Sequence, residues 1–201
     1  MEPPDDPRAR WNRKHADAVG SGTAPTDPSS FLTANDALLP TSGRAVDVAG
    51  GTGRHALWLA ARGLDVTLVD VSDTACAEAT RRAIDTGVSL DVVRADLSRD
   101  PLPAGPWDVI VVTHWLDRDV WSRLPAELAP SGTLLLCQAT VSNLDRHDRP
   151  PRHFLLEDGE VAQLADRFTA ADAALEVIAL EEGWTDEDRH EARLVLRRAA
   201  G

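Results

Sequence analysis

The stretch of sequence that decides the fold reads Val46-Asp47-Val48-Ala49-Gly50-Gly51-Thr52-Gly53-Arg54-His55. It joins a short apolar segment over residues 44–49, which we expect to be a β-strand, to a helical pattern over residues 54–62. Glycines at such a turn permit positive φ angles and let the backbone approach a ligand closely. In open α/β sheets, ligands bind outside the carboxyl ends of the strands. The stretch therefore predicts a ligand-binding loop in an α/β protein.

The sequence around this loop alternates between strand and helix patterns. We expect further strands over residues 65–69, 89–94, 107–113 and 132–137, and helices over residues 29–39, 72–86 and 119–128. Such alternation favours a parallel sheet with helices on both faces. The tail differs, because the strand-like segments 175–180 and 192–196 have no helical pattern between them. We expect them to pair as an antiparallel hairpin.

The length of 201 residues is that of a single domain. Residues 1–28 are rich in Pro, Asp, Gly and Ser, with a short helical pattern around residues 9–19. We expect them to form a partly mobile N-terminal arm, followed by one domain over residues 29–201.

Composition and charge exclude several classes of partner. The net charge is −12, whereas nucleic-acid binders carry a basic surface that neutralises phosphates. We therefore expect no nucleic-acid partner and no anionic membrane partner. The first residues lack the basic start and apolar centre of a secretory signal, and no apolar run has the ~18 residues of a membrane span. With two cysteines, too few for a disulfide framework, we expect a cytoplasmic protein.

The glycine loop is compatible with two classes of ligand, or with none if it is only a turn. Gly51-x-Gly53-x-x-Ala56, with Asp70 further on, loosely fits the fingerprint of dinucleotide-binding proteins. Asp47 favours the other class, because a carboxylate before the loop repels a pyrophosphate and attracts an ammonium group. S-adenosylmethionine carries an ammonium and a sulfonium and has no phosphate.

Five segments in order resemble the motifs of class I S-adenosylmethionine-dependent methyltransferases. They are the loop Asp47-x-x-x-Gly51-x-Gly53, the strand-end Asp70, the turn Ala95-Asp96-Leu97, the strand 107–113, and the turn 128–134 into the fifth strand. Each motif alone is weak, but five in order at the right spacing are strong. The resemblance covers residues 28–198, and the segment 46–60 is similar to the small tellurite-resistance and thiopurine-type methyltransferases.

The resemblance implies a Rossmann-like class I methyltransferase fold, α/β, with a mostly parallel seven-stranded sheet and an antiparallel C-terminal hairpin. It implies an enzyme that transfers the methyl group of S-adenosylmethionine directly to a small-molecule acceptor and releases S-adenosylhomocysteine. The cofactor-binding residues it implies are Asp47, Ala49, Gly50, Gly51, Gly53, Arg54, Asp70, Val71, Asp96, Leu97 and Thr113. Ala49 replaces the first glycine of the general motif, and His55 stands where a small polar residue is commoner.

Each acidic candidate has a structural alternative. A carboxylate that merely capped the next helix would sit nearer the helix start than Asp47, so we expect Asp47 to contact the cofactor. Asp70 precedes a helix that Ser72 or Asp73 can cap instead, which leaves Asp70 for the ribose hydroxyls. For Asp96, contact with the cofactor and a place in a solvated turn remain equal alternatives.

The acceptor side should be formed by Thr113-His114-Trp115, by the connection over residues 138–157, and by the arm with Trp11. His114 is a candidate general base, since imidazole titrates near neutral pH. The alternative is a histidine hydrogen-bonded under a loop, and methyl transfer needs no base when the reactants are well aligned. Trp11 and Trp115 are candidates for packing near the sulfonium.

The connection over residues 138–157 carries a local basic cluster, formed by Arg146, His147, Arg149, Arg152 and His153. It is either a lid over an electron-rich acceptor or a solvated loop. We expect no metal site, because His147 and His153 are six residues apart with no cysteine pair nearby.

Two other functions remain open from the sequence. An NAD-dependent oxidoreductase should have a neutral residue at position 47 and no terminal antiparallel hairpin. A non-catalytic S-adenosylmethionine-binding protein should bind the cofactor without turning it over. The acceptor and the oligomeric state are not predicted.

Overall fold

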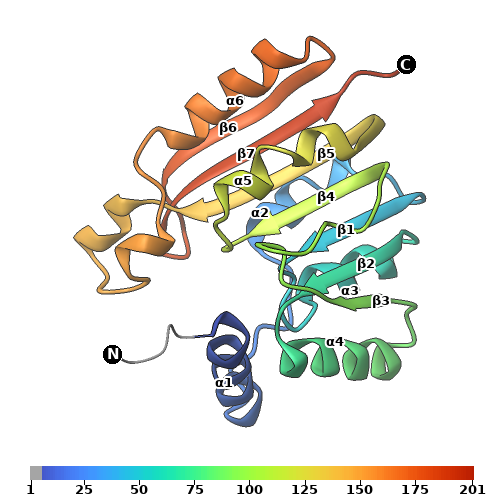
Figure 1. Ribbon diagram of the computed structural model, residues 1–201, viewed down its shortest axis with the longest axis vertical. Helices are drawn as coiled ribbons and strands as arrows, with labels where there is room; N and C mark the ends of the chain where they lie inside the picture. The colour runs from blue at the N-terminus through green and yellow to red at the C-terminus, as the bar shows by residue number, and fades with distance from the viewer. Residues whose placement is uncertain (1–5) are drawn as a thin grey trace. The chain divides into compact units, whose positions relative to one another are not determined.

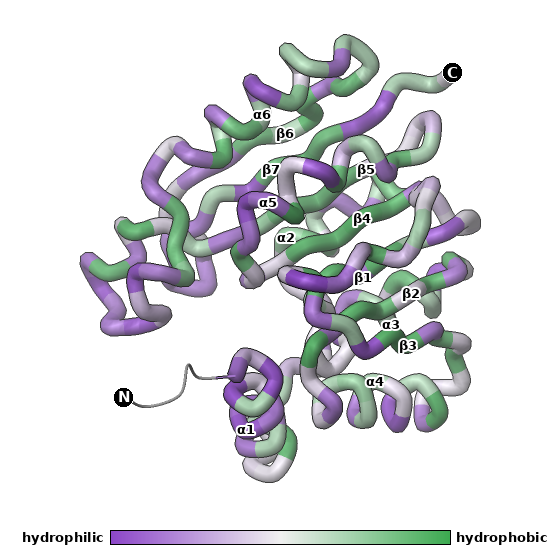
Figure 2. The backbone as a smooth tube through the Cα atoms, viewed as in Figure 1, coloured by the Kyte–Doolittle hydropathy of each residue, from purple (hydrophilic) through white to green (hydrophobic). Residues whose placement is uncertain are grey.

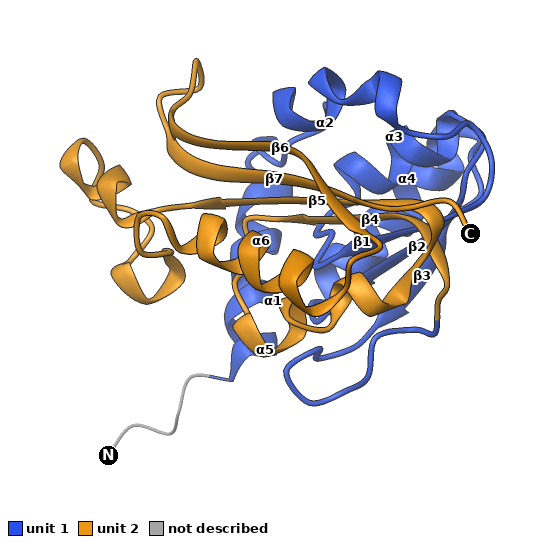
Figure 3. Ribbon diagram, turned by 90° about the horizontal axis from the view of Figure 1, so that it is seen from above, with its two compact units in different colours: residues 1–104 blue, residues 105–201 orange. Residues whose placement is uncertain are grey.

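The computed structural model describes residues 6–201. The chain divides into two compact units, unit 1 up to residue 104 and unit 2 over residues 105–201, which Figure 3 colours separately. Together they supply seven strands to one sheet, three from unit 1 and four from unit 2.

Unit 1 contains three parallel strands in the order β3-β2-β1. They are β1 (Arg44–Val48), β2 (Asp65–Asp70) and β3 (Asp91–Arg94). Its helices are α1 (Pro7–Gly20), α2 (Ser30–Ala34), α3 (Arg54–Ala61) and α4 (Asp73–Thr86), with a 3₁₀ turn η1 (Asp36–Leu38). The turn from β1 into α3 carries the glycine loop, as the sequence predicts.

Unit 2 contains four strands in the order β4-β5-β7-β6. They are β4 (Trp107–Thr113), β5 (Leu128–Ala139), β6 (Leu175–Trp184) and β7 (His190–Arg198). Its helices are α5 (Arg118–Trp121) and α6 (Glu160–Ala171), with 3₁₀ turns η2 (Leu124–Glu127), η3 (Val141–Asp145) and η4 (Arg152–Phe154). β4 and β5 are parallel, and β7 runs antiparallel to both β5 and β6. The expected C-terminal hairpin is therefore present.

The sheet supplies much of the core. Figure 2 shows apolar residues along the strands, and the continuous apolar run over residues 109–112 in β4 is fully buried. Burial of large aliphatic side chains stabilises the fold by ~1.5–3 kcal/mol for each one. These features confirm the class I methyltransferase fold, with its mixed seven-stranded sheet, that the sequence predicts.

The expected ends of α4 are confirmed. The Ser72 hydroxyl accepts a hydrogen bond from the Ala75 amide at 3.1 Å, and Gly87 ends the helix with φ +71°. The helical pattern of the arm is also confirmed, because α1 covers residues 7–20 and lies beside α4 within unit 1 (Figure 1).

The continuous helix expected over residues 29–39 is wrong. α2 ends at Ala34, and a separate 3₁₀ turn follows. Asn35 explains the break, since its side-chain amide donates to the Phe31 carbonyl at 2.8 Å. Asparagine competes for backbone hydrogen bonds in this way and so ends helices.

The helix expected over residues 119–128 is wrong as well. One α-turn, α5, is followed by the 3₁₀ turn η2, which contains Pro125. Proline has no amide hydrogen and disfavours a continuing helix. β5 begins at Leu128 rather than at residue 132, and its register against β4 shifts between Trp107 and Val109. Helix α6, which the sequence analysis did not include, buries Val161, Leu164, Ala165 and Phe168 on one face.

No helix within residues 6–201 is long and apolar enough to cross a membrane.

Candidate functional site

The glycine loop is held by backbone hydrogen bonds to the end of β2. The Gly50 amide donates to the Val69 carbonyl at 3.1 Å, and the Gly53 amide donates back to Gly50 at 3.0 Å. Ala49, Gly51 and Gly53 have φ values of +54°, +56° and +88°. Ala49 therefore adopts a left-handed conformation, which alanine disfavours by ~1–2 kcal/mol. The glycine that the general motif has at this position avoids that cost.

Gly50 and Gly51 lack side chains for different reasons. A Cβ atom on Gly50 would lie 2.7 Å from the Asp47 carboxylate and 2.9 Å from Leu68, so the loop packs directly on the strand. A Cβ on Gly51 would instead meet the His15 ring of α1 at 3.2 Å. Gly51 thus turns its open face away from the sheet and toward the arm.

Asp47 lies at the carboxyl end of β1 and is 1% exposed. Its Oδ2 accepts the Ala56 amide at 3.1 Å, so Asp47 does cap the first turn of α3, and the expectation that it is too far from the helix start is wrong. Burial raises the pKa of Asp47 to about 7, against the lowering effects of the Ala56 amide and Arg54. The carboxyl group therefore changes its charge near neutral pH, where an approaching cation favours the ionised form.

Asp70 ends β2 and is also buried. Its Oδ2 accepts the Gly51 amide at 2.9 Å and its Oδ1 accepts the Ser72 amide at 2.8 Å. The carboxylate is therefore fixed between the glycine loop and the start of α4. A carboxylate offers about four acceptor positions, so two remain for hydroxyl donors of a ligand.

Helix α1 lies over this part of unit 1. The Asn12 side chain accepts from the Ser72 hydroxyl at 2.7 Å and from the Thr74 amide at 3.3 Å, which ties α1 to the first turn of α4. One turn further along, His15 lies next to Gly51. Burial lowers the pKa of His15, with Lys14 acting in the same direction and Asp70 opposing them. The arm thus places the imidazole of His15 beside the glycine loop.

The remaining unit 1 candidates have mixed surroundings. Asp96 accepts from the Ser98 amide at 3.2 Å and from its hydroxyl at 2.6 Å, so it has the turn role that the sequence left open. Leu97 is buried, while Val71 and Arg54 are half-buried. Their contacts with a cofactor remain predictions.

In unit 2, Thr113 ends β4 and His114 follows it. His114 is a non-glycine residue with φ +56°, and its amide donates to the Cys137 carbonyl at 2.9 Å. Its imidazole Nε2 lies 3.7 Å from Oε1 of the buried Glu191 and 3.4 Å from the Arg189 guanidinium. Residues held in such strained conformations cluster at functional sites.

The basic cluster of the connection is largely paired within unit 2. Arg146 forms an ion pair with Asp188 at 2.9 Å and stacks on Trp184 at 3.8 Å. His147 bonds to the Asp188 carbonyl at 2.6 Å. Since Arg189 is the next residue and contacts His114, the turn between β6 and β7 joins the connection to the end of β4.

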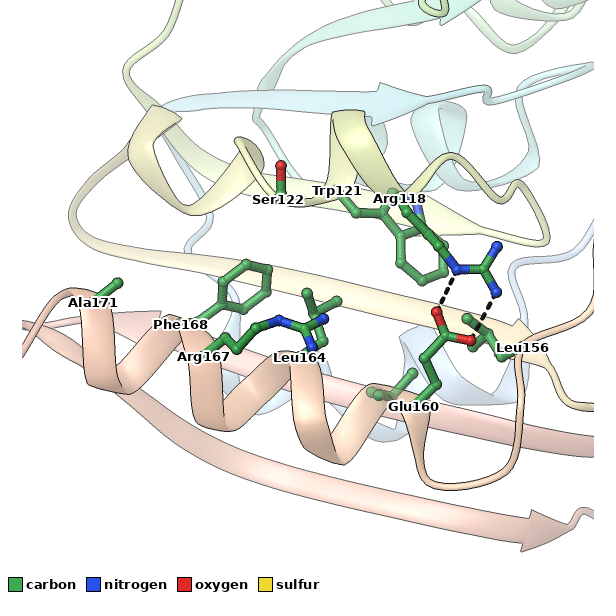
Figure 4. A pocket seen from close by; sticks show the side chains of 10 residues that line it. Arg118, Trp121, Ser122, Leu156, Glu160, Leu164, Arg167, Phe168 and Ala171 are labelled. Atoms are coloured by element: carbon green, nitrogen blue, oxygen red, sulfur yellow. Dashed lines mark hydrogen bonds and ion pairs between the residues drawn. The ribbon is translucent and has the colours of Figure 1, made fainter.

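A separate groove of about 260 Å³ lies between α5 and α6 (Figure 4). Trp121, Leu164 and Phe168 line it, and the Arg118–Glu160 ion pair closes one end. None of the predicted site residues lines this groove. It therefore adds nothing to the candidate site.

Comparisons with known proteins identify the class. The family model described as a methyltransferase domain matches residues 45–131, from the first strand into the fifth. No curated protein sequence matches this chain.

Many solved structures share the fold. TehB from Haemophilus influenzae has 19% identity and a TM-score of 0.68, over 92% of this chain and 67% of that one. A TehB-like methyltransferase from Corynebacterium glutamicum has 18% identity and a TM-score of 0.63, over 95% and 97%. Magnesium protoporphyrin IX methyltransferase from Synechocystis, solved with bound S-adenosylhomocysteine, has 16% identity and a TM-score of 0.58, over 99% and 90%. At these identities the likeness establishes only the fold. The methyl acceptor of each relative is a property of that protein and is not carried over to this chain.

The matched domain and the fold together support one class: residues 45–131 match a methyltransferase domain, and the fold is that of S-adenosylmethionine-dependent methyltransferases. The expected resemblance to the tellurite-resistance type is confirmed at the level of the fold, since TehB and a TehB-like protein are among its structural relatives. The antiparallel hairpin, which was expected for a methyltransferase and not for an NAD-dependent oxidoreductase, is present.

Three residues of these sites are not among those that the sequence predicts. Asn12 and His15 lie three residues apart, on one face of α1. The surrounding sequence is mostly polar, so this spacing does not stand out from it. Glu191 lies near the start of the apolar strand β7 and is 3% exposed. An acidic residue in a strand-like apolar segment is the sequence signal that could have identified it.

Proposed function

We propose that the protein transfers the methyl group of S-adenosylmethionine to a small-molecule acceptor by direct displacement, in the cytoplasm. The acceptor's lone pair forms a bond to the methyl carbon while the carbon–sulfur bond breaks and its electron pair stays on sulfur. The sulfonium becomes the thioether of S-adenosylhomocysteine, and a protonated acceptor loses its proton to a base or to water. The protein contributes alignment and exclusion of water.

The observation that carries the cofactor part is the arrangement around Asp70. Its carboxylate is fixed by the Gly51 and Ser72 amides, next to a loop of left-handed residues. In the proposed complex Asp70 accepts the ribose hydroxyls, Asp47 attracts the α-ammonium group, and the loop backbone lies against the ligand. Val71, Asp96 and Leu97 contact the adenine side, and Thr113 lies at the methyl end.

The small size of the acceptor is supported by charge. A net charge of −12 disfavours nucleic acid and anionic lipid surfaces as substrates. We place the acceptor at the end of β4, where His114 lies beside Glu191 at the start of β7 and Arg189 in the turn before it.

We propose that residues 1–28 act as an arm that closes on the cofactor and that residues 29–201 form the methyltransferase domain. The support is the position of the His15 ring, which lies 3.2 Å from where a Cβ atom on Gly51 would be, and the hydrogen bonds of Asn12 to the start of α4.

Cofactor binding is the first test. Calorimetry should show S-adenosylmethionine and S-adenosylhomocysteine binding at micromolar affinity, about −8 kcal/mol. NAD should give no heat. Binding heat with NAD, and none with S-adenosylmethionine or S-adenosylhomocysteine, would contradict the proposal.

Turnover is the second part of the same test. Methyl transfer from labelled S-adenosylmethionine should be detected with at least one of potassium tellurite, 2-mercaptoethanol, thiophenol, catechol or aniline. Tight cofactor binding without transfer to any of them would favour the non-catalytic binding protein instead.

The arm gives a further prediction. Deletion of residues 1–20 should lower turnover and raise the dissociation rate of S-adenosylhomocysteine ~10-fold, because a segment that covers the ligand is lost. Asn12→Ala should act in the same direction, since it removes the hydrogen bonds to Ser72 and Thr74. Stopped-flow displacement measures the rate, and Asp17→Ala on the exposed face of α1 is the control. An unchanged dissociation rate in the deletion variant would show that the arm does not cover the cofactor.

A further inference from the structure

The groove between α5 and α6 results from a difference in length between the two helices. α5 spans four residues, about one turn, whereas α6 spans twelve residues, about three turns. The 3₁₀ turn η2, which contains Pro125, follows α5 in place of a longer helix. α5 therefore covers only part of α6, and the groove follows α6 from Glu160 to Ala171 (Figure 4).

The walls of this groove are apolar, and its charged groups sum to one positive charge. Trp121, Leu164 and Phe168 supply the apolar surface. The charged residues along it are two arginines and one glutamate. Arg118 donates to both oxygens of the Glu160 carboxylate, so these two charges neutralise each other. The second guanidinium remains as the net charge of the groove.

That second guanidinium belongs to Arg167, whose side chain extends along the groove in Figure 4. Carboxylates three or four positions away on a helix are common partners of an arginine. On α6 these positions hold Gln163, Leu164, Ala170 and Ala171. Within residues 6–201 no hydrogen bond or ion pair engages the Arg167 side chain. Its charge still reaches Glu160, because Arg118 and, more weakly, Arg167 hold the pKa of that carboxyl below its ordinary value.

We infer that this groove binds a small apolar carboxylate, whose hydrocarbon body packs against Trp121, Leu164 and Phe168 and whose carboxylate pairs with Arg167. A guanidinium group presents parallel donors that match the two oxygens of a carboxylate. The volume of about 260 Å³ lies just below the ~300 Å³ at which small-molecule pockets begin, so the ligand is small. Among the described residues that line the groove, none is a candidate of the cofactor or acceptor site, so the inference goes beyond the proposed function and is independent of it.

The charge of the whole protein makes the preference for an anion a sharp test. With a net charge of −12, non-specific attraction favours cations over anions. A preference for an anion must therefore come from the groove itself. The probes are sodium octanoate, 1-octanol and octylammonium chloride, which share one hydrocarbon chain and carry a negative, a neutral and a positive head group.

Calorimetry with the full chain should show saturable binding of one octanoate with a dissociation constant of ~1 mM or below. 1-Octanol should bind ~10-fold more weakly, because a hydroxyl lacks the charge that strengthens a hydrogen bond to a guanidinium. Octylammonium should bind more weakly still, since Arg167 repels it. No saturable binding of octanoate, or binding of octylammonium that is as tight, would overturn the inference.

Variants at position 167 measure the contribution of the cation. Arg167→Gln should weaken octanoate binding ~10-fold and leave 1-octanol binding unchanged, because a hydrogen bond to a charged group is lost while the apolar walls remain. Arg167→Lys should retain part of the affinity, since it keeps the charge without the paired donors. Arg123→Gln is the matched control, because Arg123 is exposed in the same unit and does not line the groove. An equal loss in Arg123→Gln would attribute the binding to general charge and overturn the inference.

NMR locates the bound chain. Nuclear Overhauser effects from the octanoate methylene protons should reach the Phe168 ring and the Leu164 methyl groups, the latter assigned with Leu164→Val. Contacts only with residues outside the groove would overturn the inference. Sedimentation velocity tests a second copy of this chain as the occupant instead. If the chain forms a dimer that Arg167→Gln dissociates, the groove is an interface between two copies and the inference is wrong.

Discussion

Asp47→Asn should weaken the binding of S-adenosylmethionine ~10²-fold and leave the fold intact, because hydrogen bonds to charged groups contribute about 1.5–3 kcal/mol. The asparagine carbonyl can still accept the Ala56 amide, so the capping of α3 is kept. Only the negative charge offered to the ligand's ammonium group is lost. Calorimetry measures the loss, and Asp65→Asn, an exposed residue at the start of β2, is the control.

The pH dependence of the same residue has a definite sign. The pKa of Asp47 is about 7 in the free protein, and a bound cation stabilises the ionised form. Affinity in the wild type should therefore weaken as the pH falls below about 7 and stay nearly constant in Asp47→Asn. A wild-type affinity that is independent of pH between 5.5 and ~8.5 would show that Asp47 does not face the ammonium group.

Stability should change in the opposite direction. The folded pKa of Asp47 exceeds its ordinary value of 3.8, so the folded protein holds more protons than the unfolded chain between pH 3.8 and about 7. The free energy of unfolding of the wild type should then fall as pH rises through this window. The free energy of unfolding of Asp47→Asn should not decrease in this way, because asparagine does not ionise. Measured by urea unfolding at pH 8, the variant should be at least as stable as the wild type.

The sequence predicts the fold well where local signals and burial agree. The apolar run of β4, the cap at Ser72 and the stop at Gly87 each follow from one dominant physical effect, and all three are found. The helices expected over residues 29–39 and 119–128 failed because single residues redirect the backbone. Asn35 competes for a carbonyl, and Pro125 lacks an amide hydrogen.

The candidate site could be predicted only in part. The glycine loop and Asp70 are marked by local spacing, so sequence reasoning brings them together, and in the structure the Gly51 amide bonds to the Asp70 carboxylate. His15 and Glu191 come to their partners through tertiary packing, over separations along the chain that no local pattern encodes. Asp47 shows a third case, in which one carboxylate caps a helix and is also a candidate ligand contact, so the two interpretations do not exclude each other.

The largest effect is expected for Gly51→Val, which should abolish binding of S-adenosylmethionine. Gly51 has φ +56°, its amide donates to Asp70 at 2.9 Å, and a Cβ atom added there would point toward the His15 ring of α1, the side on which we propose that the cofactor binds. A branched side chain fills that space. Calorimetry and urea unfolding together measure whether binding is lost from a folded protein.

The variant Gly87→Val is the control for the effect of backbone strain. Gly87 has a comparable φ of +71°, and a Cβ atom added there would meet no other atom within 4 Å. Valine at this position therefore costs similar strain, ~1–2 kcal/mol, in open space. It should destabilise the protein through this strain and bind the cofactor normally. Equal loss of binding in both variants would attribute the effect to strain alone.

The neighbouring helix provides the last control. A valine at position 51 would also press on His15, whose ring lies 3.2 Å from the Cβ position. If displacement of α1 were the cause, the double variant His15→Ala with Gly51→Val would recover binding. If the valine side chain blocks the cofactor directly, the double variant should not bind S-adenosylmethionine, whereas His15→Ala alone should still bind it. Normal binding by Gly51→Val would instead show that the loop is only a turn, and the cofactor would have to be sought elsewhere in the fold.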